Sequence, residues 1–187
     1  MGRIVVTEYI SVDGVVEAPS GTETFERVGW TDDFSRGHEG DAFKFEETMA
    51  SDALLLGRVT YDSFAAVWPT FEGEFADRFN SMPKYVFSST LESPEWSNTT
   101  VLRGGVAAAV AELRDRYERD VVVHGSAHLA RTLIELELVD ELRLLVYPVV
   151  VGAGARLFGD TPRKQNLRLV ETRTFEDGIH LLVYRPR

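Results

Sequence analysis

The sequence predicts an α/β protein whose mixed, mostly parallel sheet has flanking helices and a C-terminal antiparallel hairpin. Three observations lead to this prediction. Short apolar runs typical of buried strands alternate with amphipathic stretches typical of helices up to about residue 139. After that residue, strand-like runs follow one another without helices between them. Of the 187 residues, 44% are apolar and 27% are charged, which is enough core-forming material for one domain spanning residues 1–187.

The parallel part of the predicted sheet comes from short apolar runs. The first spans residues 4–10, where Val and Ile are mixed with Thr, Glu and Tyr. The others span residues 53–56, 84–88, 99–102 and 121–124. Residues 17–40 are rich in Gly, Ser, Thr and Glu but too few for an interdomain linker, so we expect a long loop there.

Two helices are predicted most clearly between these runs. One has apolar residues at offsets of 3, 4, 7 and 11 from the first, which is the spacing of one helix face: Val106, Ala109, Val110, Leu113 and Tyr117. The other begins near Ser126 and carries Leu129, Leu133 and Leu136 on one face. A serine before a helix commonly accepts a hydrogen bond from the first-turn N–H groups, so Ser126 is the expected N-cap.

The end of the chain is predicted to contain strands only, over residues 141–151, 167–175 and 179–184. Asp177 and Gly178 lie between the last two runs. Both residue types tolerate the positive φ of a type I′ turn, so we expect an antiparallel hairpin there.

Charge excludes two classes of partner. Acidic residues outnumber basic ones by 30 to 20, which gives a net charge of −10 and a pI near 4.9. Such a surface repels nucleic acids and anionic membranes, so we expect neither as a partner. The chain has no run of 18 apolar residues and no apolar stretch near its start of the kind found in signal peptides, and we therefore expect a cytoplasmic protein.

Metal chemistry is not expected. The sequence has no cysteine, which excludes structural disulfides, thiolate zinc sites and iron–sulfur clusters. His124 and His128 are four residues apart, but they straddle a strand end and a helix start and would not share a helix face.

Four segments suit a dinucleotide because each follows a predicted strand and begins a turn or helix with small or hydroxyl residues. They are residues 57–61 (GRVTY), 88–90 (SST), 103–105 (RGG) and 124–128 (HGSAH). The N–H groups at a helix start bind phosphate, and ligands of open α/β sheets lie beyond the carboxyl ends of parallel strands. Each segment alone is better explained by plain turn chemistry than by a ligand. Together they favour a ligand.

These segments resemble the RibD C-terminal domain family of the dihydrofolate reductase-like superfamily. The resemblance rests on residues 11–14 (SVDG), 55–61 (LLGRVTY), 84–91 (KYVFSSTL), 124–129 (HGSAHL), 138–142 (LVDEL), 148–154 (PVVVGAG) and 157–158 (LF). It implies an eight- or nine-stranded mixed sheet flanked by helices, with NADPH bound across the strand ends, and a homodimer. Because the deaminase half that usually accompanies this reductase is missing, it also implies a free-standing reductase domain.

The resemblance also implies which residues contact NADPH. Gly57, Arg58 and Thr60 match the segment for the pyrophosphate and the 2′-phosphate. Ser88, Ser89 and Thr90 match the segment near the adenosine phosphate, with Arg103 assisting, and Gly125, Ser126, Ala127 and Leu129 match the turn over the diphosphate. The planar guanidinium of Arg58 suits a 2′-phosphate. Alternatively, Arg58 pairs with Asp62 on a solvated face.

Catalytic candidates follow from the same resemblance. Asp41 precedes Gly57 at the spacing of the helix carboxylate that supports protonation in folate reductases. The alternative is that Asp41 belongs to a solvated helix start rich in acids. Asp13 could meet a substrate hydroxyl or serve a turn. Phe45, Trp68 and Tyr147, and also Trp30, are candidates for the wall of a substrate pocket, although aromatic residues are more often part of the core.

Three functions remain open at this stage. The first is an NADPH-dependent reductase that transfers a hydride to a small heterocyclic, imine or carbonyl substrate. The second is 5-amino-6-(5-phosphoribosylamino)uracil reductase of riboflavin biosynthesis, which needs a second basic pocket; Arg156, Arg163 and Lys164 are the candidates, or else surface salt-bridge residues. The third is a sensor that binds NADP(H) without turnover.

Overall fold

The computed structural model describes residues 1–21, 24–159, 161 and 163–187. Its strands are β1 (Arg3–Ser11), β2 (Ser51–Gly57), β3 (Lys84–Phe87), β4 (Thr99–Leu102), β5 (Asp120–His124), β6 (Glu141–Tyr147), β7 (Leu167–Thr174) and β8 (His180–Pro186). Its α-helices are α1 (Gly37–Ala50), α2 (Arg58–Val67), α3 (Glu74–Ser81), α4 (Val106–Arg116) and α5 (Ala127–Glu135). Two short 3-10 helices span Trp68–Thr70 and Glu176–Gly178.

All these strands form one eight-stranded sheet in the order β4-β3-β2-β5-β1-β6-β8-β7. Only β8 runs antiparallel to its neighbours, β6 and β7; the other pairs are parallel. The predicted fold class, a mixed, mostly parallel sheet with flanking helices and a C-terminal antiparallel pair, is therefore confirmed.

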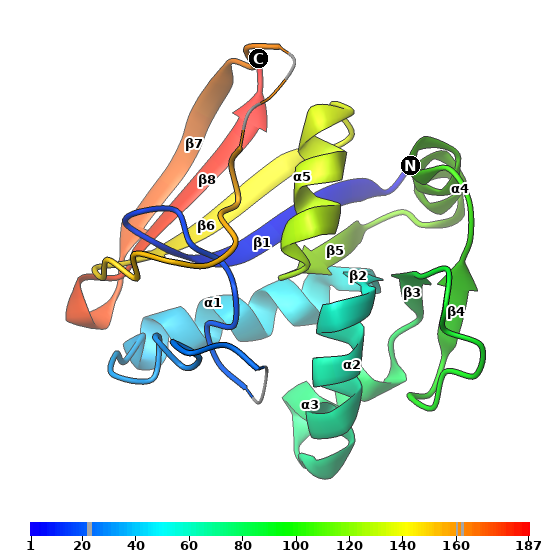
Figure 1. Ribbon diagram of the computed structural model, residues 1–187, viewed down its shortest axis with the longest axis horizontal. Coiled ribbons are helices and arrows are strands. Elements are labelled where there is room, and N and C mark those ends of the chain that lie inside the picture. The colour runs from blue at the N-terminus through cyan, green and yellow to red at the C-terminus, as the bar shows by residue number, and fades with distance from the viewer. Residues whose placement is uncertain (22–23, 160, 162) are drawn as a thin grey trace.

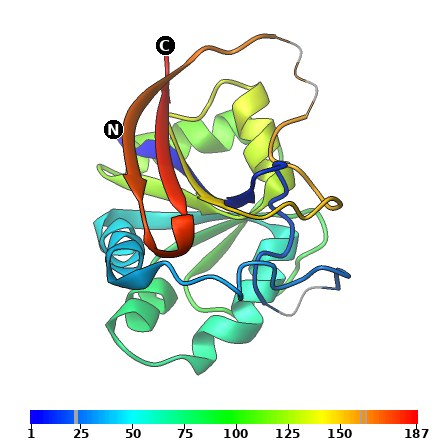
Figure 2. The ribbon, with the colours of Figure 1, turned by 90° about the vertical axis from the view of Figure 1, so that its left-hand side faces the viewer.

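The helices cover both faces of the sheet. Figures 1 and 2 show α1, α2 and α3 on one side and α4 and α5 on the other. On the α4–α5 side, Ile4 and Val6 of β1 pack with Val110 of α4 and Leu133 of α5. On the opposite side, a second cluster joins the sheet to Tyr61, Phe79, Met82 and their neighbours. Strands buried on both faces explain the nearly continuous apolar runs in the sequence.

The topology creates a switch point between two central strands. The chain leaves β1 through α1 on one face and enters β2, whereas it leaves β5 through α5 on the other face and enters β6. Because β5 and β1 are adjacent and parallel, the two connections diverge at their carboxyl ends. Ligands of open α/β sheets bind at such a point.

The structure differs from the sequence prediction at two places. The strand predicted over residues 141–151 ends at Tyr147, because Pro148 has no N–H group to donate and the chain turns, with the Val149 N–H bonded to the Tyr147 carbonyl at 2.8 Å. Asp177 and Gly178 have positive φ, as expected. However, strand pairing resumes only at Thr174 and His180, so the connection is longer than a two-residue turn.

Within the described part of the chain, none of the helices combines the length and the apolar composition needed to cross a membrane.

Candidate active site

A cavity of about 1260 Å³ opens at the switch point. It lies where β1, β2 and β5 end and where α2 and α5 begin, and α1 and the loop after β1 complete its wall. Pockets for drug-sized ligands have volumes of roughly 300–1,000 Å³, so this cavity has room for a dinucleotide and a small second molecule. Its lining includes the predicted site residues Asp41, Phe45, Gly57, Arg58, Thr60, Trp68, Gly125, Ser126, Ala127 and Leu129.

Two turns at the mouth of the cavity are tied to each other. The Gly57 N–H donates to Ser126 Oγ at 2.9 Å, and the Ser126 N–H donates to Thr60 Oγ1 at 2.9 Å. Gly125 and Ser126 both have positive φ, of 55° and 64°. A Cβ on Gly125 would lie 3.4 Å from the Thr60 side chain, so glycine allows the close approach of the two turns. The turns after β2 and β5 thus form one rigid edge.

This arrangement corrects one sequence expectation. Ser126 occupies the N-cap position of α5, but its side chain makes no capping bond to that helix and instead accepts from Gly57. Thr60, which the resemblance places at the cofactor phosphates, is 8% exposed, and its hydroxyl oxygen accepts the Ser126 N–H.

The residues at this edge fit an anionic group. Helices α2, α4 and α5 begin at Arg58, Val106 and Ala127 without a hydrogen bond from a capping side chain. Arg58, Val106 and Ala127 line the cavity. Uncapped N–H groups and the positive end of the helix dipole bind phosphate, so a diphosphate suits this edge.

The remaining residues predicted for the cofactor lie together at the rim beside Arg58. Arg58 Nη1 donates to Thr90 Oγ1 at 3.3 Å, and Arg103 donates to the backbone carbonyls of Ser89 and Leu91 at 3.0 and 2.8 Å. The structure therefore brings the Ser88–Ser89–Thr90 loop and Arg103 next to Arg58; Arg58 lines the cavity, and the other four residues lie outside its lining.

Arg58 also forms the ion pair that the sequence offered as an alternative. Both carboxylate oxygens of Asp62 accept from Arg58 Nε, at 2.8 and 2.7 Å. The Nη groups of Arg58 make no contact with Asp62, so the ion pair fixes one edge of the guanidinium and leaves the other edge toward Thr90.

Aromatic side chains form one wall of the cavity. Phe45 lies 6.5 Å from Phe75 between ring centroids, and Phe75 lies 5.4 Å from Trp68. Phe79 packs 4.5 Å from Trp68, and Phe64 completes the group. The structure thus brings together two of the predicted wall residues, Phe45 and Trp68. Our sequence analysis missed Phe75 and Phe79, although they are four residues apart, at the spacing of one helix face.

Asp41 lies at the cavity but is engaged by a cation. Its Oδ1 accepts from Arg36 Nε at 3.1 Å and from Arg36 Nη2 at 2.8 Å. Its side chain is 66% exposed, which matches the solvated helix start that the sequence offered as the alternative.

Asp13 lies outside the cavity lining and holds a turn. Its carboxylate accepts from Ser11 Oγ at 2.7 Å and from the N–H groups of Val151 and Gly152 at 3.0 and 2.8 Å. The Ser11 hydroxyl and these N–H groups lower the pKa of Asp13 to about 2. Of the two roles considered for Asp13, these contacts correspond to the turn.

Tyr147 also lies outside the main cavity. It is 1% exposed and packs in a separate aromatic cluster with Tyr9, Trp30 and Phe34, at ring-centroid distances of 5.5 to 5.8 Å. It borders a smaller hollow of about 400 Å³ that shares Tyr9, Arg36 and Asp41 with the main cavity.

The floor of the cavity holds three titratable side chains that our sequence analysis did not select, Glu8, Lys44 and His124. Burial raises the pKa of Glu8 well above its usual range, although Lys44 opposes the shift. Burial, together with the charge of Lys44, lowers the pKa of His124 to about 3. Glu8 Oε1 and His124 Nε2 are sealed from solvent and have no hydrogen-bond partner among the described residues. Glu8 could have been selected from the sequence, because a glutamate is unusual within the apolar run of residues 4–10.

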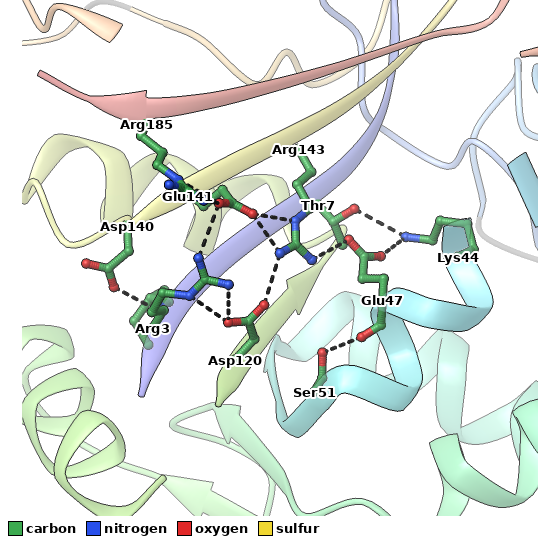
Figure 3. A network of polar contacts seen from close by, with 11 residues as sticks. Arg3, Thr7, Lys44, Glu47, Ser51, Asp120, Asp140, Glu141, Arg143 and Arg185 are labelled. Atoms are coloured by element: carbon green, nitrogen blue, oxygen red, sulfur yellow. Dashed lines mark hydrogen bonds and ion pairs between the residues drawn. The ribbon is translucent and has the colours of Figure 1, made fainter. Parts of the chain in front are cut away.

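Lys44 connects the cavity floor to an ion network at the other end of the same strands, shown in Figure 3. Lys44 Nζ donates to Thr7 Oγ1 at 3.2 Å and pairs with Glu47. Arg143 links Glu47 to Asp120, at 3.1 and 3.0 Å. Burial alone would raise the pKa of Glu47, but the charges of Lys44 and Arg143 bring it down to about 2.

Comparisons with known proteins identify the family and the fold of the chain. The family model of the RibD C-terminal domain matches residues 3–181. The protein YyaP of Bacillus subtilis is 29% identical over 191 aligned residues, which cover 97% of this chain and 94% of YyaP. A crystal structure from Shewanella sp. PV-4 that carries the name of a riboflavin biosynthesis protein superposes with a TM-score of 0.79 at 16% identity, covering 99% of both chains. A pyrimidine reductase-like protein from Corynebacterium diphtheriae gives a TM-score of 0.68 at 14% identity, over 99% of this chain and 92% of the other.

Proposed function

Because the chain belongs to the RibD C-terminal domain family, a family of reductase domains, we propose that it is an NADPH-dependent reductase acting on a small heterocyclic, imine or carbonyl substrate. The observation that carries the proposal is the pair of tied turns after β2 and β5. They open two uncapped helix N-termini onto one large cavity. When bound, NADPH supplies the hydride.

We propose that the residues of the tied edge hold the cofactor. The N–H groups at the starts of α2 and α5 would bind the diphosphate, with Gly57 and Gly125 allowing close approach. The Nη edge of Arg58, fixed by Asp62 and next to Thr90, would bind the 2′-phosphate that distinguishes NADPH from NADH. The aromatic wall formed by Phe45, Trp68, Phe75 and Phe79 would bind a planar substrate.

Calorimetric titration of NADPH and of NADH tests the cofactor. We expect the wild type to bind NADPH more tightly, and Arg58→Ala to weaken NADPH binding by roughly 1.5–3 kcal/mol, the range for hydrogen bonds to charged groups, with little change for NADH. Arg168→Ala, an exposed arginine on the distant edge strand β7, is the matched control and should change neither value. Equal losses for both nucleotides in Arg58→Ala would contradict the 2′-phosphate role.

A second candidate is 5-amino-6-(5-phosphoribosylamino)uracil reductase. It is favoured by the names of the two structural neighbours, a riboflavin biosynthesis protein and a pyrimidine reductase-like protein. Oxidation of NADPH, followed by its absorbance, with this aminopyrimidine, with the cyclic imine 1-pyrroline and with pyridine-3-carbaldehyde separates the candidates. Turnover of the aminopyrimidine alone supports the second, whereas tight NADPH binding without turnover of any probe supports a sensor.

We also propose that the protein forms the homodimer implied by the resemblance. The edge strand β7 supports this, since its Leu167, Leu169 and Val170 are 38%, 48% and 38% exposed. Light scattering that finds only monomer at micromolar concentration would contradict it.

A further inference from the structure

Glu8 makes no contact that explains its burial. It lies on β1 with Ile4, Val6 and Ile10 on the same side of the strand, and these three belong to the apolar core. Glu8 is 2% exposed, and its Oε1 has no hydrogen-bond partner in the part of the chain that the structure describes. A buried polar atom without a partner costs free energy, and native structures contain few of them. Glu8 therefore destabilises the fold and calls for a functional explanation.

Glu8 lies at the switch point of the sheet, on the side of β1 that faces α4 and α5. On β1, Thr7 lies opposite His124, the last residue of β5, and Glu8 is the next residue. It thus borders the point where β5 ends and the Gly125 turn begins, and it lines the cavity. Both diverging connections, through α1 and α5, leave from this point.

The charges around Glu8 oppose the effect of burial only weakly. Lys44 of α1 is the cation that opposes the effect of burial, but Lys44 is itself paired with Glu47. The other titratable groups lining the cavity come from β1, the following loop, α1, α2, β5 and α5: Tyr9, Glu17, Arg36, His38, Asp41, Glu46, Arg58, His124 and His128. Burial outweighs Lys44 and raises the pKa of Glu8. Burial thus favours the protonated form of the Glu8 side chain, which has a proton to donate.

We propose that Glu8 is the catalytic acid of this site, presenting a protonated carboxyl group to the substrate at the floor of the cavity. The proposal rests on the reductase function proposed above. Hydride adds to the carbon of a C=N or C=O bond, and the two electrons of that π bond move to the heteroatom. The heteroatom takes the proton from the Glu8 carboxyl group, and the carboxylate that remains is reprotonated by water from the open cavity mouth.

The other candidates are less suited to this step. His124 has a pKa of about 3 and is neutral, so it can hydrogen bond but is not an imidazolium acid. The Lys44 ammonium donates to Thr7 and Glu47. Asp41 is exposed and accepts hydrogen bonds from Arg36.

An infrared measurement tests the state of Glu8 without any turnover. At neutral pH the wild type should show the carbonyl stretch of a protonated carboxylic acid, and Glu8→Gln should lack it. Glu39→Gln, the same change at an exposed position of α1 outside the cavity lining, should retain it. Addition of NADPH should shift the band, because the carboxyl group borders the bound cofactor. A missing band, or a band that NADPH leaves in place, would overturn the proposal.

Turnover tests the role. With the probe that the wild type reduces among the aminopyrimidine, 1-pyrroline and pyridine-3-carbaldehyde, Glu8→Gln should lower kcat by about 100-fold or more, the lower end for loss of a general acid. The Kd for NADPH should stay within about twofold. The wild-type rate should fall as pH rises through the Glu8 pKa, Glu8→Gln should lack this fall, and Glu8→Asp should restore part of the rate. Unchanged kcat in Glu8→Gln, or loss of the pH-dependent fall in Lys44→Met only, would overturn the role of Glu8.

The two proposals fail in different ways. If the wild type neither binds NADPH nor reduces any probe, the proposed function is wrong. If it binds NADPH and reduces no probe, the infrared spectra still test Glu8: a band that shifts with NADPH supports a protonated carboxyl group beside the cofactor, and a missing or unshifted band overturns it. If it turns over and Glu8→Gln turns over equally, only the assignment of Glu8 is wrong.

Discussion

At one end of the central strands the buried charged groups are paired, and at the other end buried polar atoms lack partners among the described residues. At the amino-terminal ends, Asp120 and Glu141 are 6% and 3% exposed, and arginines surround both carboxylates. Arg3 lies 2.7 Å from Asp120, and Arg143 lies 2.6 Å from Glu141. At the carboxyl ends, Glu8 and His124 have polar atoms without partners among the described residues.

The contrast separates charges that stabilise the fold from polar groups that are available to a ligand. Removing ions from water costs several kcal/mol per ion, and only close, hydrogen-bonded opposite charges offset that cost. In the network of Figure 3 the buried carboxylates are paired with cations of the protein itself, so the network meets that condition without a ligand. The cavity floor does not meet it, and polar groups that destabilise a fold persist at sites where a ligand uses them.

The largest expected effect is on the paired end. Arg143→Ala should lower the free energy of unfolding by about 3–5 kcal/mol, because it leaves the buried Glu47, Asp120 and Glu141 without their shared cation. Urea denaturation measures it. Arg185→Ala is the matched control: that side chain also pairs with Glu141 but is 46% exposed, so it should cost less than about 1 kcal/mol. Equal costs for the two variants would show that the network is not what stabilises this end.

Two isosteric changes should give opposite pH dependence. Glu47 has a lowered pKa of about 2, so its stabilising contribution is present above the unfolded pKa of roughly 4.3 and is lost as pH falls toward 2. Glu8 has a raised pKa, so the stability linked to its titration is present below about 4.3 and is lost as pH rises.

Thermal unfolding from pH 4 to pH 8 measures this contrast. Glu47→Gln should be less stable than the wild type, most strongly at pH 8. Glu8→Gln should match the wild type near pH 4 and exceed it in stability at pH 8, because there the wild type must take up a proton or bury a charge on folding and the glutamine does neither. A Glu8→Gln protein that is less stable at pH 8 would mean that Glu8 has a structural partner.

A smaller effect is expected at the turn held by Asp13. Its pKa of about 2 predicts stability that is present above about pH 4 and lost as pH falls toward 2. Asp13→Asn should therefore be less stable than the wild type at pH 7, with the difference shrinking in acid. Turnover per folded molecule should change little. A large loss of kcat in a fully folded Asp13→Asn variant would indicate that Asp13 takes part in catalysis.

The smallest effect is expected at Asp41. Because Asp41 is exposed and its carboxylate is engaged by Arg36, Asp41→Asn should leave kcat nearly unchanged. Measuring kcat of Asp41→Asn and of Glu8→Gln in the same assay compares a solvated carboxyl group with a buried one. If Asp41→Asn has the larger effect, the acid is the one expected from the family resemblance.

The sheet and the cofactor edge could be predicted from the sequence because their signals are local. Apolar runs identified the strands, and the strand–glycine–helix turns at Gly57 and Gly125 identified the edge where the cavity opens. The aromatic wall was half predicted, through Phe45 and Trp68. The extent of β6 was overpredicted because apolar residues continue on both sides of Pro148, where the strand ends.

The cavity floor could not be predicted because its signals are not local. The state of Glu8 depends on Lys44, which lies on α1, and the state of Lys44 depends on Glu47 and on Arg143 of β6. Pairing of Arg58 with Asp62 was foreseen as an alternative because the two are one helix turn apart. By contrast, the tie between Ser126 and Gly57 joins residues far apart in the chain and needed the fold.

A crystal structure of the protein with NADPH would test the central claim most directly. We predict the diphosphate at the N–H groups that begin α2 and α5, the 2′-phosphate at Arg58, and the nicotinamide ring beside the Glu8 carboxyl group. A cavity without nucleotide at saturating NADPH, or a nicotinamide ring held away from β1, would contradict the account.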